Sequence, residues 1–565
     1  MTWVDYLIVV GFLSFMAVAG LWISRLIKTS DDFFVAGREL TPFILAATIT
    51  ATNLSMFHFI GFGGTAYQNG VSIIWQNWTG DIALVLSGIF VLPIMRRLRI
   101  RSIPEFLELR YSRPMRTIVG AFWGLRLSIY LGMLMYIAAT AAVAITGFNH
   151  YGAWLFIFAV VALLYSVIGG AWAVAIMDSV QFLVMVAGAL VVFPIAMKLA
   201  GGIPGMWHYF QTTNQLQRVT YVPHGGDFNW LFITSMMLLG FKWASIDQAI
   251  LQRAFGAKSP RVGAKGMIIS GIITTPMAFL WILPGLVVTK LHPAPFADAA
   301  HPAGNPDLAI PWLLATYLPA YGRGLLGFVL CGLVAAQVSV VTADVNSVAT
   351  LITSDVYRTL KSTDPTQKQL LRVVRFSSLA CGTLMLVVAW LLQYIGVGAV
   401  KINLTIVGIL DMPLFVVTVI YGLGWRRTNW QGACCGFVAG GILGVGCYKF
   451  LQPSVARNIA PLVSTTAALI FTPIFTLLTR PQTHDRADRI FEAMKANADD
   501  GDAQPFGLIP SSLIGKVGAG LALLGFVAFI TGVLSARISF AGANMLAVGG
   551  MIVVFIGGVI RVCAR

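Results

Sequence analysis

Long apolar stretches, separated by short polar loops, run through the whole chain. With 58% hydrophobic and 11% charged residues among 565, most of the protein must lie in lipid, where an α-helix needs about 20 apolar residues to cross the hydrocarbon core. Backbone polar groups in lipid must be hydrogen-bonded within the protein, which a helix achieves in a single segment. The sequence therefore predicts an all-α polytopic membrane protein with about 15 spans. The expected spans are 3–27, 41–66, 71–96, 114–147, 152–170, 173–200, 228–252, 262–292, 322–354, 369–398, 400–424, 429–451, 457–479, 512–535 and 541–563.

Basic residues are concentrated in every second loop between these spans. Loops rich in Arg and Lys stay on the cytoplasmic side of a membrane, so the N-terminus is expected outside and the C-terminus in the cytoplasm. We expect the plasma (inner) membrane, with the lipid bilayer as the surrounding partner. The net charge of +16 belongs to these loops, and no nucleic-acid partner is expected. The basic loops are 25–38, 96–116, 253–265, 358–375, 426–427 and 480–495.

No sequence motif indicates an enzyme. The Walker A and HExxH patterns are absent from the sequence, which therefore offers neither a Walker-type phosphate cradle nor a metalloprotease site. The six cysteines lie in or beside apolar spans and show no disulfide framework or metal-site spacing. The longest basic segment, 480–510, is too short to bury a hydrophobic core. We therefore expect a protein without catalytic activity and without a cofactor.

The span that begins at residue 322 carries many polar side chains. Polar groups cost free energy in hydrocarbon, so these side chains must face protein or water. At about 3.6 residues per turn, Ala335, Ser339 and Thr342 share one stripe of the helix. Hydroxyls, together with a carboxylate such as that of Asp344, suit a hard cation that takes oxygen ligands. Helix packing through small residues is the alternative, and the carboxylate favours a cation site. The polar residues are Gln337, Ser339, Thr342, Asp344, Asn346, Ser347 and Thr350.

Two other spans, 41–66 and 228–252, contain residues that interrupt a helix. The glycines of the first span permit unwound backbone, whose carbonyls can point at an ion. Two interrupted spans that lie five spans apart are typical of inverted-repeat transporters, which bind solute and ion where the two meet. The interrupting residues are Asn53, Ser55, His58, Gly61, Gly63 and Gly64 in the first span, and Gly240, Lys242, Ser245 and Asp247 in the second. The expected units are an N-terminal helix and loop (1–40), two repeats (41–200 and 228–424) and accessory helices (429–565).

Seven short stretches between residues 30 and 435 match one protein family in that family's order. They are FFVAGREL (33–40), TNLSMFHFIGFGG (52–64), IRSIPEFLELRYS (100–112), GGAWAVAIMDSVQ (169–181), QRAFGAKS (252–259), VAAQVSV with NSVATLITSDVY (334–340 and 346–357) and YGLGWRRTNWQGA (421–433). On these residues the chain resembles the sodium/solute symporter family, which includes the sodium/glucose cotransporters. The resemblance implies a five-plus-five inverted-repeat core of the LeuT-like kind, with one extra helix before it and about four after it.

The resemblance implies a sodium site between the first interrupted span and the polar span. Carried over by position, its ligands are the backbone carbonyls of Ala51, Leu54 and Ala336 and the hydroxyl of Ser339. The family has a second hydroxyl at the next position, where this chain has Val340, so the site has one oxygen ligand fewer. Sodium remains the expected coupling ion.

Some family members bind a second sodium ion, for which the resemblance implies Asp178 and hydroxyls near Thr342. Another hydroxyl of that site is replaced by Ala343, and Asp344 follows directly. The expected cation ligands therefore include Asp178, Thr342 and Asp344. Proton coupling through Asp178, Asp344 or His58 is the open alternative, because a buried carboxylate can carry a proton where sodium ligands are incomplete.

The resemblance also implies a solute pocket. Aromatic faces and paired hydrogen-bonding groups at the implied positions suit a sugar. Lys242 favours a solute with a carboxylate, unless it pairs with Asp247 or Asp81. Trp243 stands where sugar-transporting members have a gating aromatic residue. The expected solute-binding residues are His58, Asn77, Trp78, Gly240, Lys242, Trp243 and Thr274, with Gly80 at one further contact position.

We therefore expect a secondary-active, sodium-coupled symporter that imports a small polar organic solute by alternating access. A sugar or a sugar-derived acid is the first expectation for the solute. A proton-coupled transporter, or a transporter of organic anions or amino acids, is the alternative within the same fold. A channel or a membrane sensor is the alternative class of protein. A channel needs a continuous polar ring along a pore, whereas the polar positions here gather on interrupted spans.

Overall fold

The computed structural model describes residues 1–23, 36–223, 225–296, 304–361, 365–395, 409, 411–480, 485–495, 506–538 and 542–564, without the side chains of 21, 165–171, 394–395, 453–454, 457, 485, 493 and 495. In these residues the chain is helical, and the single β-type contact among them is a bridge between Leu40 and Ala257. The predicted all-α class is confirmed. Most of the expected basic loop 25–38 and the start of the expected span 400–424 lie outside the described residues.

Ten helices in the described chain are long and apolar enough to cross a membrane, and a bent pair of helices adds an eleventh. The expected number, about 15, is higher because it includes short apolar stretches and counts parts of one continuous helix as separate spans. Residues 151–200, for example, form one helix, α9 (Tyr151–Ala200), across two expected spans. Two further apolar helical stretches, Tyr151–Leu164 within α9 and Asp411–Gly424, border on residues outside this description.

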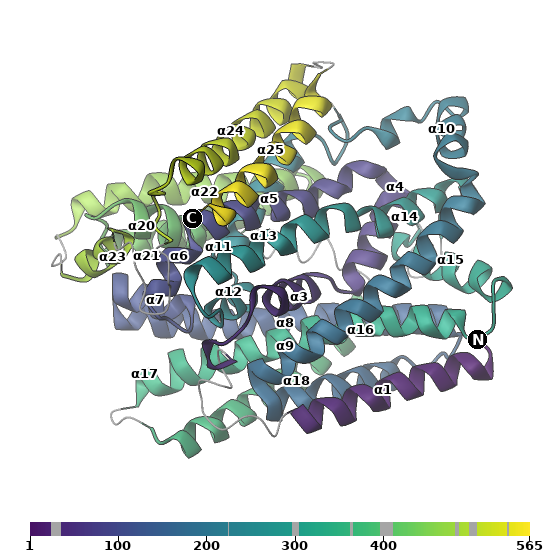
Figure 1. The fold of residues 1–565 in the computed structure, drawn as a ribbon, viewed down its shortest axis with the longest axis horizontal. Helices are drawn as coiled ribbons and strands as arrows, with labels where there is room; N and C mark the ends of the chain where they lie inside the picture. Colours follow the sequence, from purple (N-terminus) through teal and green to yellow (C-terminus); the bar gives the residue numbers. More distant parts are fainter. Residues whose placement is uncertain are drawn as a thin grey trace.

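The helices run side by side along the long axis of the molecule (Figure 1). On one side, α1 (Trp3–Ile23) packs against α9 and against α16 (Leu325–Thr350). On the other side, α25 (Ala543–Cys563) packs against α5 (Ile74–Phe90) and α13 (Pro260–Met277). The first helix and the last helices therefore flank the central helices from opposite sides.

The last two helices form a closely packed hairpin. A Cβ atom on Gly525 of α24 (Leu513–Ser535) would lie 2.6 Å from the backbone nitrogen of Val554, and one on Gly557 of α25 would lie 2.3 Å from that of Ala522. These distances leave no room for a side chain, so the two backbones are in direct contact. The glycines of this contact recur at seven-residue intervals, at Gly518, Gly525 and Gly532 in α24 and at Gly550 and Gly557 in α25.

The central helix of the molecule is α16. It contacts α1, α9, α3 (Pro42–Asn53), α8 (Arg113–Thr146) and α18 (Gln367–Ile395). Almost all of its side chains from Leu326 to Thr350 are buried, so its polar residues face protein, as predicted. Beyond Thr350 the helix continues in a π-helical turn, Leu351–Tyr357.

Both predicted helix interruptions are present. The first helix, α3, ends at Leu54, whose backbone is extended (φ −92°, ψ 112°). The chain resumes as a π-helical turn, Phe57–Phe62, that leads into α4 (Gly63–Asn69), and the segment from Phe57 to Asn69 is bent by 56° from α3. The second helix, α11 (Trp230–Ile246), ends at Asp247, which is also extended (φ −66°, ψ 126°). The Asp247 carboxylate then accepts the N–H of Ala249 at 3.1 Å and caps the next helix, α12 (Gln248–Phe255).

The glycines of the first interrupted helix do not unwind it, which corrects the prediction made for Gly61, Gly63 and Gly64. They lie within the π-helical turn and α4, and the last two provide close packing. A Cβ atom on Gly64 would lie 2.4 Å from the carbonyl oxygen of Pro306. One on Gly285 of α14 (Phe279–Leu291) would lie 2.0 Å from the carbonyl oxygen of Gly63. The chain unwinds at Leu54 and Ser55 instead, because the His58 ring accepts the Ser55 N–H at Nδ1 (3.2 Å) and starts the next helical segment there.

The two ends of the molecule carry different short helices. The N-terminus, α10 (Gly202–Thr212) and α15 (Ala309–Tyr317) lie at one end (Figure 1). The opposite end contains α7 (Ile103–Arg110), α17 (Arg358–Leu360) and α23 (Asp485–Lys495), all from loops that the sequence marks as basic. The basic loops thus gather at one end of the fold, while the side of the membrane that this end faces stays a prediction.

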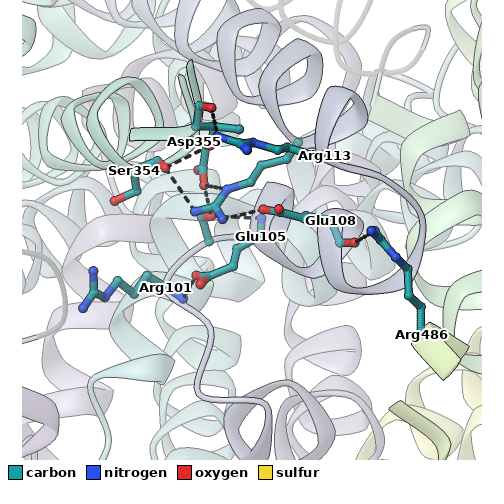
Figure 2. Close-up of polar contacts among 10 residues, drawn as sticks. Arg101, Glu105, Glu108, Arg113, Ser354, Asp355 and Arg486 are labelled. Carbon is teal, nitrogen blue, oxygen red and sulfur yellow. Dashed lines mark hydrogen bonds and ion pairs between the residues drawn. The ribbon is translucent and has the colours of Figure 1, made fainter. Parts of the chain in front are cut away.

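A polar network joins four segments of the chain at the basic end (Figure 2). Arg116 of α8 pairs with Asp355 (Nε to Oδ1, 2.7 Å) and with Glu108 of α7 (Nη1 to Oε2, 2.7 Å). Asp355 is fully buried and also accepts the Ser102 hydroxyl at 2.8 Å. Arg486 reaches over from α23 and donates to the carbonyl oxygen of Glu108 at 2.8 Å (Figure 2). Buried charge therefore ties the basic end together, a feature that the sequence analysis did not identify.

Candidate functional site

A cavity of 180 Å³ lies where the two interrupted helices meet α5, α8 and α16. Gly80 of α5 lines it, and a Cβ atom there would lie 3.5 Å from the Trp243 ring, so a larger residue would fill the space beside this ring. The structure thus brings most of the expected solute-binding residues to one place. Those in the wall are His58, Asn77, Gly240, Lys242 and Trp243.

Other polar residues also line the wall, and of these Thr52, Asn53 and Tyr130 were not assigned to a pocket from the sequence. Gln76 precedes Asn77 in α5, and Thr52 and Asn53 end α3 just before its break. Tyr130 contributes to the wall from α8. Two adjacent amides in an apolar span, Gln76 and Asn77, were a usable sequence signal. Tyr130 offered none, because a single tyrosine in an apolar helix is ordinary.

Two expected solute contacts, Trp78 and Thr274, lie outside the cavity wall in this structure. The Trp78 indole stacks on the Tyr221 ring, with centroids 5.6 Å apart, and donates to the carbonyl oxygen of Thr275 at 2.9 Å. The Thr274 hydroxyl donates to Asp81 at 2.5 Å. Both side chains are satisfied by the protein, so in this arrangement they support the wall rather than face a solute.

Asp411 is the main site residue that sequence reasoning missed. Its carboxylate is fully buried and lies 2.6 Å from Lys242 Nζ and 3.2 Å from Arg126 Nη1, both through Oδ2. Its Oδ1 accepts the indole N–H of Trp123 at 3.2 Å. Lys242 also pairs with Asp247 at 3.2 Å, one of the two partners predicted for it. One buried carboxylate therefore holds two buried cations at the edge of the cavity, and we call Asp411, Lys242 and Arg126 the Asp411 triad.

The other predicted partner of Lys242, Asp81, is engaged elsewhere. Its two carboxylate oxygens accept the hydroxyls of Thr274 and Thr275, at 2.5 and 3.0 Å. A sequence signal for Asp411 did exist, because an acidic residue inside an apolar span needs a partner in the protein. Only the fold shows which acidic residue pairs with Lys242, because Asp411 lies far from Lys242 in the sequence.

A second polar cluster surrounds Asp178 of α9, and we call it the Asp178 cluster. Ser339 of α16 donates to Oδ1 at 2.6 Å, and Thr48 of α3 donates to Oδ2 at 2.6 Å. Arg253 of α12 lies 3.8 Å from Oδ2 and donates through Nε to the Thr48 hydroxyl at 3.2 Å. The Thr342 hydroxyl donates to the carbonyl oxygen of Ser339 at 2.9 Å. The structure thus joins three expected cation-site residues and adds Thr48 and Arg253 to them.

The break in α3 fits the carbonyl ligands that were expected of a sodium site. In an unbroken helix the Ser55 N–H would bond to the carbonyl oxygen of Ala51, but here it bonds to the His58 ring. Ala51 O is therefore left without its helical donor, close to the extended residue Leu54. The Ser339 hydroxyl donates its proton to Asp178 and keeps acceptor capacity for a cation. Carbonyl and hydroxyl oxygens of this kind are the ligands that sodium, a hard cation, would take.

The remaining expected cation ligands divide between the two places. Ala336 is buried one turn before Ser339 on the same helix. Val340, which stands in place of a family hydroxyl, lines the solute cavity. Asp344 lies one turn further along and also lines the cavity, 3% exposed. It interacts electrostatically with Arg253 of the Asp178 cluster as well as with Arg126 and Lys242 of the Asp411 triad.

Comparison with known proteins gives a consistent result over most of the chain. The sequence pattern of the sodium:solute symporter family matches residues 33–440. The sodium/glucose cotransporter of Vibrio parahaemolyticus is 28% identical over 513 residues, which is 84% of this chain and 91% of that protein. The sodium/myo-inositol cotransporter 2 of Homo sapiens is 27% identical over 474 residues, 78% of this chain and 69% of that protein.

A solved structure is similar at the level of the fold. A Na⁺-coupled sialic acid symporter in a substrate-bound, outward-open state matches with a TM-score of 0.72 and 19% identity, over 85% of this chain and 99% of that one. The likeness shows the predicted LeuT-like fold. Because the family match covers more than half of the chain, the protein belongs to the sodium:solute symporter family.

Proposed function

We propose that the protein imports a small polar organic solute together with sodium by alternating access. The proposal rests on the cavity at the meeting point of the two interrupted helices, where an inverted-repeat transporter binds its solute. The Asp178 cluster joins α3 to α9 and α16 through buried hydroxyls, as a cation site of this fold requires. The family is one of transporters, and the apolar helices make the chain an integral membrane protein.

Sodium is proposed to bind between the end of α3 and α16. The proposed ligands are the carbonyls of Ala51, Leu54 and Ala336 and the hydroxyl of Ser339, with Asp178 and Thr342 beside them. The Arg253 guanidinium already lies 3.8 Å from Asp178. A sodium ion bound directly to this carboxylate would have to compete with that positive charge, so Ser339 and the carbonyls are the primary ligands of the proposal.

A polyhydroxylated solute, either a sugar or a sugar-derived acid, suits the cavity. The Trp243 ring offers a face for the C–H edges of a sugar, and Asn77, Gln76 and His58 offer hydrogen-bonding groups. Relatives named for glucose and myo-inositol support the same class of solute. The volume of 180 Å³ limits the solute to a small molecule.

Coupling follows from the shared helix. Ser339 of the Asp178 cluster and Val340 of the cavity wall are adjacent residues of α16. Sodium bound at Ser339 would fix α16 against α3 and shift the population toward the state that admits solute. Because such coupling is reciprocal, bound solute would raise the affinity for sodium by the same factor.

Uptake by the purified protein in liposomes tests the proposal. Glucose, myo-inositol and N-acetylneuraminate would be offered under an inward sodium gradient, an inward proton gradient or no gradient. Accumulation of one solute that requires the sodium gradient supports sodium symport. Accumulation that requires the proton gradient would overturn sodium coupling in favour of proton coupling, the alternative that Val340 keeps open. Gradient-independent flux of all three solutes would indicate a channel.

The orientation is proposed from the basic loops. The end that contains α7, α17 and α23 would face the cytoplasm, and the N-terminus would face outside, in a plasma (inner) membrane. Modification of single engineered cysteines in these loops by a membrane-impermeant thiol reagent, on intact cells and on inverted vesicles, measures this orientation directly.

A further inference from the structure

The charges around the solute cavity are not balanced. Lys242 and Arg126 supply two positive charges, which are 2% and 8% exposed. Asp411, Asp247 and Asp344 supply three carboxylates at or directly behind the wall. Arg253, which acts electrostatically on Asp247 and Asp344, lies 3.8 Å from Asp178. Three cations therefore face four carboxylates.

Lys242 and Arg126 already lie within ion-pair distance of carboxylates of the protein. Asp411 lies 2.6 Å from Lys242 and 3.2 Å from Arg126, and Asp247 lies 3.2 Å from Lys242. Arg126 keeps one buried N–H, at Nε, without a partner, but its charge is compensated by Asp411. A carboxylate of a solute would thus have to displace a buried carboxylate of the protein at Lys242, or approach Arg126 as a second negative charge beside Asp411.

Asp344 is the charged group of the wall that lacks such a match. It lines the cavity and is 3% exposed, and no hydrogen bond or ion pair with another described residue reaches its carboxylate. A buried charge without a partner is costly, and its energy falls when an opposite charge arrives. Arg253, Arg126 and Lys242 act on Asp344 electrostatically, but each of them lies within 4 Å of another carboxylate and none forms an ion pair with Asp344. Among the described groups, Asp344 therefore has no positive charge in direct contact.

Neutral groups of the wall point the same way. The side-chain oxygens of Asn77 and Gln76 are buried and have no hydrogen-bond donor. Both residues line the cavity with Asp344. The Nδ1 atom of His58 accepts the Ser55 N–H, so this nitrogen carries no proton and the ring is neutral. Two acceptor oxygens, those of Asn77 and Gln76, therefore await donors from the ligand, while the Asn77 amide nitrogen and the Nε2–H of His58 remain as donors.

We infer that Asp344 binds one positive charge that enters the cavity with the solute, and that the cavity consequently disfavours a solute whose charge is a carboxylate alone. The positive charge is carried either by a protonated amine of the solute or by a coupling cation seated beside an uncharged solute. Hydroxyl O–H groups or ammonium N–H groups of the ligand donate to the side-chain oxygens of Asn77 and Gln76. The inference rests on the proposed function and narrows its solute class to an aminated or uncharged polyol, away from a sugar acid.

Three sugars that differ in charge on one ring test this inference: glucose, glucosamine and glucuronate. Their binding to the purified full-length protein is measured by thermal stabilisation, in sodium and in choline, since a ligand of the folded state raises its apparent stability. Asp344→Asn removes the charge of the wall, and Asp344→Glu keeps it. Asp488→Asn, at a carboxylate on the exposed α23, is the matched control for loss of one negative charge.

Two results support the inference and identify the source of the charge. If the amine is the source, glucosamine stabilises the wild type most, and Asp344→Asn weakens its apparent affinity about tenfold or more, as expected for a lost charged hydrogen bond. If a cation is the source, Asp344→Asn reduces the dependence of stability on sodium concentration, with or without glucose. In either case Asp344→Glu retains more of the effect than Asp344→Asn, and Asp488→Asn equals the wild type.

Two results would overturn it. One is a wild type that glucuronate stabilises more than glucose and glucosamine, a comparison that needs no variant to fold. The other is an Asp344→Asn protein whose responses to glucosamine and to sodium match those of the wild type. Glucosamine binding that is lost in Asp344→Asn but independent of sodium would instead refute sodium coupling and leave the role of Asp344 intact.

Discussion

Removal of the Asp411 charge provides the sharpest test of the site. In Asp411→Asn the side-chain shape is kept, but Lys242 and Arg126 lose the carboxylate that lies 2.6 and 3.2 Å from them. Both cations are nearly inaccessible to solvent, at 2% and 8% exposure, so water cannot replace the lost partner. We expect the protein to unfold more easily and the cavity wall to become positively charged.

The size of the effect follows from the burial of the pair. Loss of one partner of a buried ion pair costs about 3–5 kcal/mol, because it leaves an uncompensated charge. Lys242 keeps Asp247 at 3.2 Å, so one of the two cations retains an opposite charge. We therefore expect a loss near the lower limit, about 3 kcal/mol in the free energy of unfolding.

The assay is unfolding of the purified protein in detergent, followed through the reaction of its buried thiols. Cys331 and Cys381 are free and buried, so a thiol-reactive dye reports the loss of the fold. Asp488→Asn is the control, because Asp488 pairs with Arg426 at an exposed site where ion pairs contribute about 0–1 kcal/mol.

A double-mutant cycle separates the pair from other effects of the substitution. Lys242→Met in the Asp411→Asn background removes both partners, and we expect a coupling energy of about 1–3 kcal/mol between the two changes. If Asp411→Asn is as stable as Asp488→Asn, or if the two changes in the cycle are additive, the Asp411 triad does not hold the site and the reasoning fails.

Two further changes test the packing of the first interrupted helix and the proposed cation site. Gly285→Ala would place a Cβ atom 2.0 Å from the carbonyl oxygen of Gly63, and because a backbone atom cannot yield cheaply, we expect a loss of about 1–3 kcal/mol in unfolding free energy. Gly441→Ala, with no atom within 4 Å of its Cβ, should be neutral or slightly stabilising, and equal unfolding midpoints for the two variants would contradict the packing argument. Ser339→Ala removes one proposed sodium ligand and should raise the sodium concentration for half-maximal stabilisation about tenfold. An unchanged sodium titration would exclude Ser339 as a ligand.

Local chemistry made part of the site predictable. Ser339 was identifiable because hydroxyls and a carboxylate gather on one polar span, and Asp178 was expected from the resemblance to the family. The fold brings their side-chain oxygens to 2.6 Å. The second helix break was likewise readable, because Asp247 is both a poor residue for a helix interior in lipid and a good cap for the helix that follows.

The other features of the site depend on tertiary contacts, which the sequence alone does not indicate. The glycines Gly63 and Gly64 looked like a point of unwinding, but their small size serves contact with α14 and Pro306 instead. The choice of Asp411 over Asp81 as a partner of Lys242 depends on which carboxylate is already engaged by threonine hydroxyls. Neither outcome follows from residue type or spacing.

The glycine contact between α24 and α25 has a consequence for how the chain is assembled. In lipid no hydrophobic force drives helices together, so two spans associate through close van der Waals contact between their backbones. These two helices are neighbours in sequence and supply that contact to each other, with glycines every seven residues along both. The pair can therefore form during membrane insertion without the other helices and dock afterwards as a preformed unit, through Gly558 against Val85 of α5. A bulky residue at Gly525 would then slow the folding of the newly made protein before it altered the rate of transport.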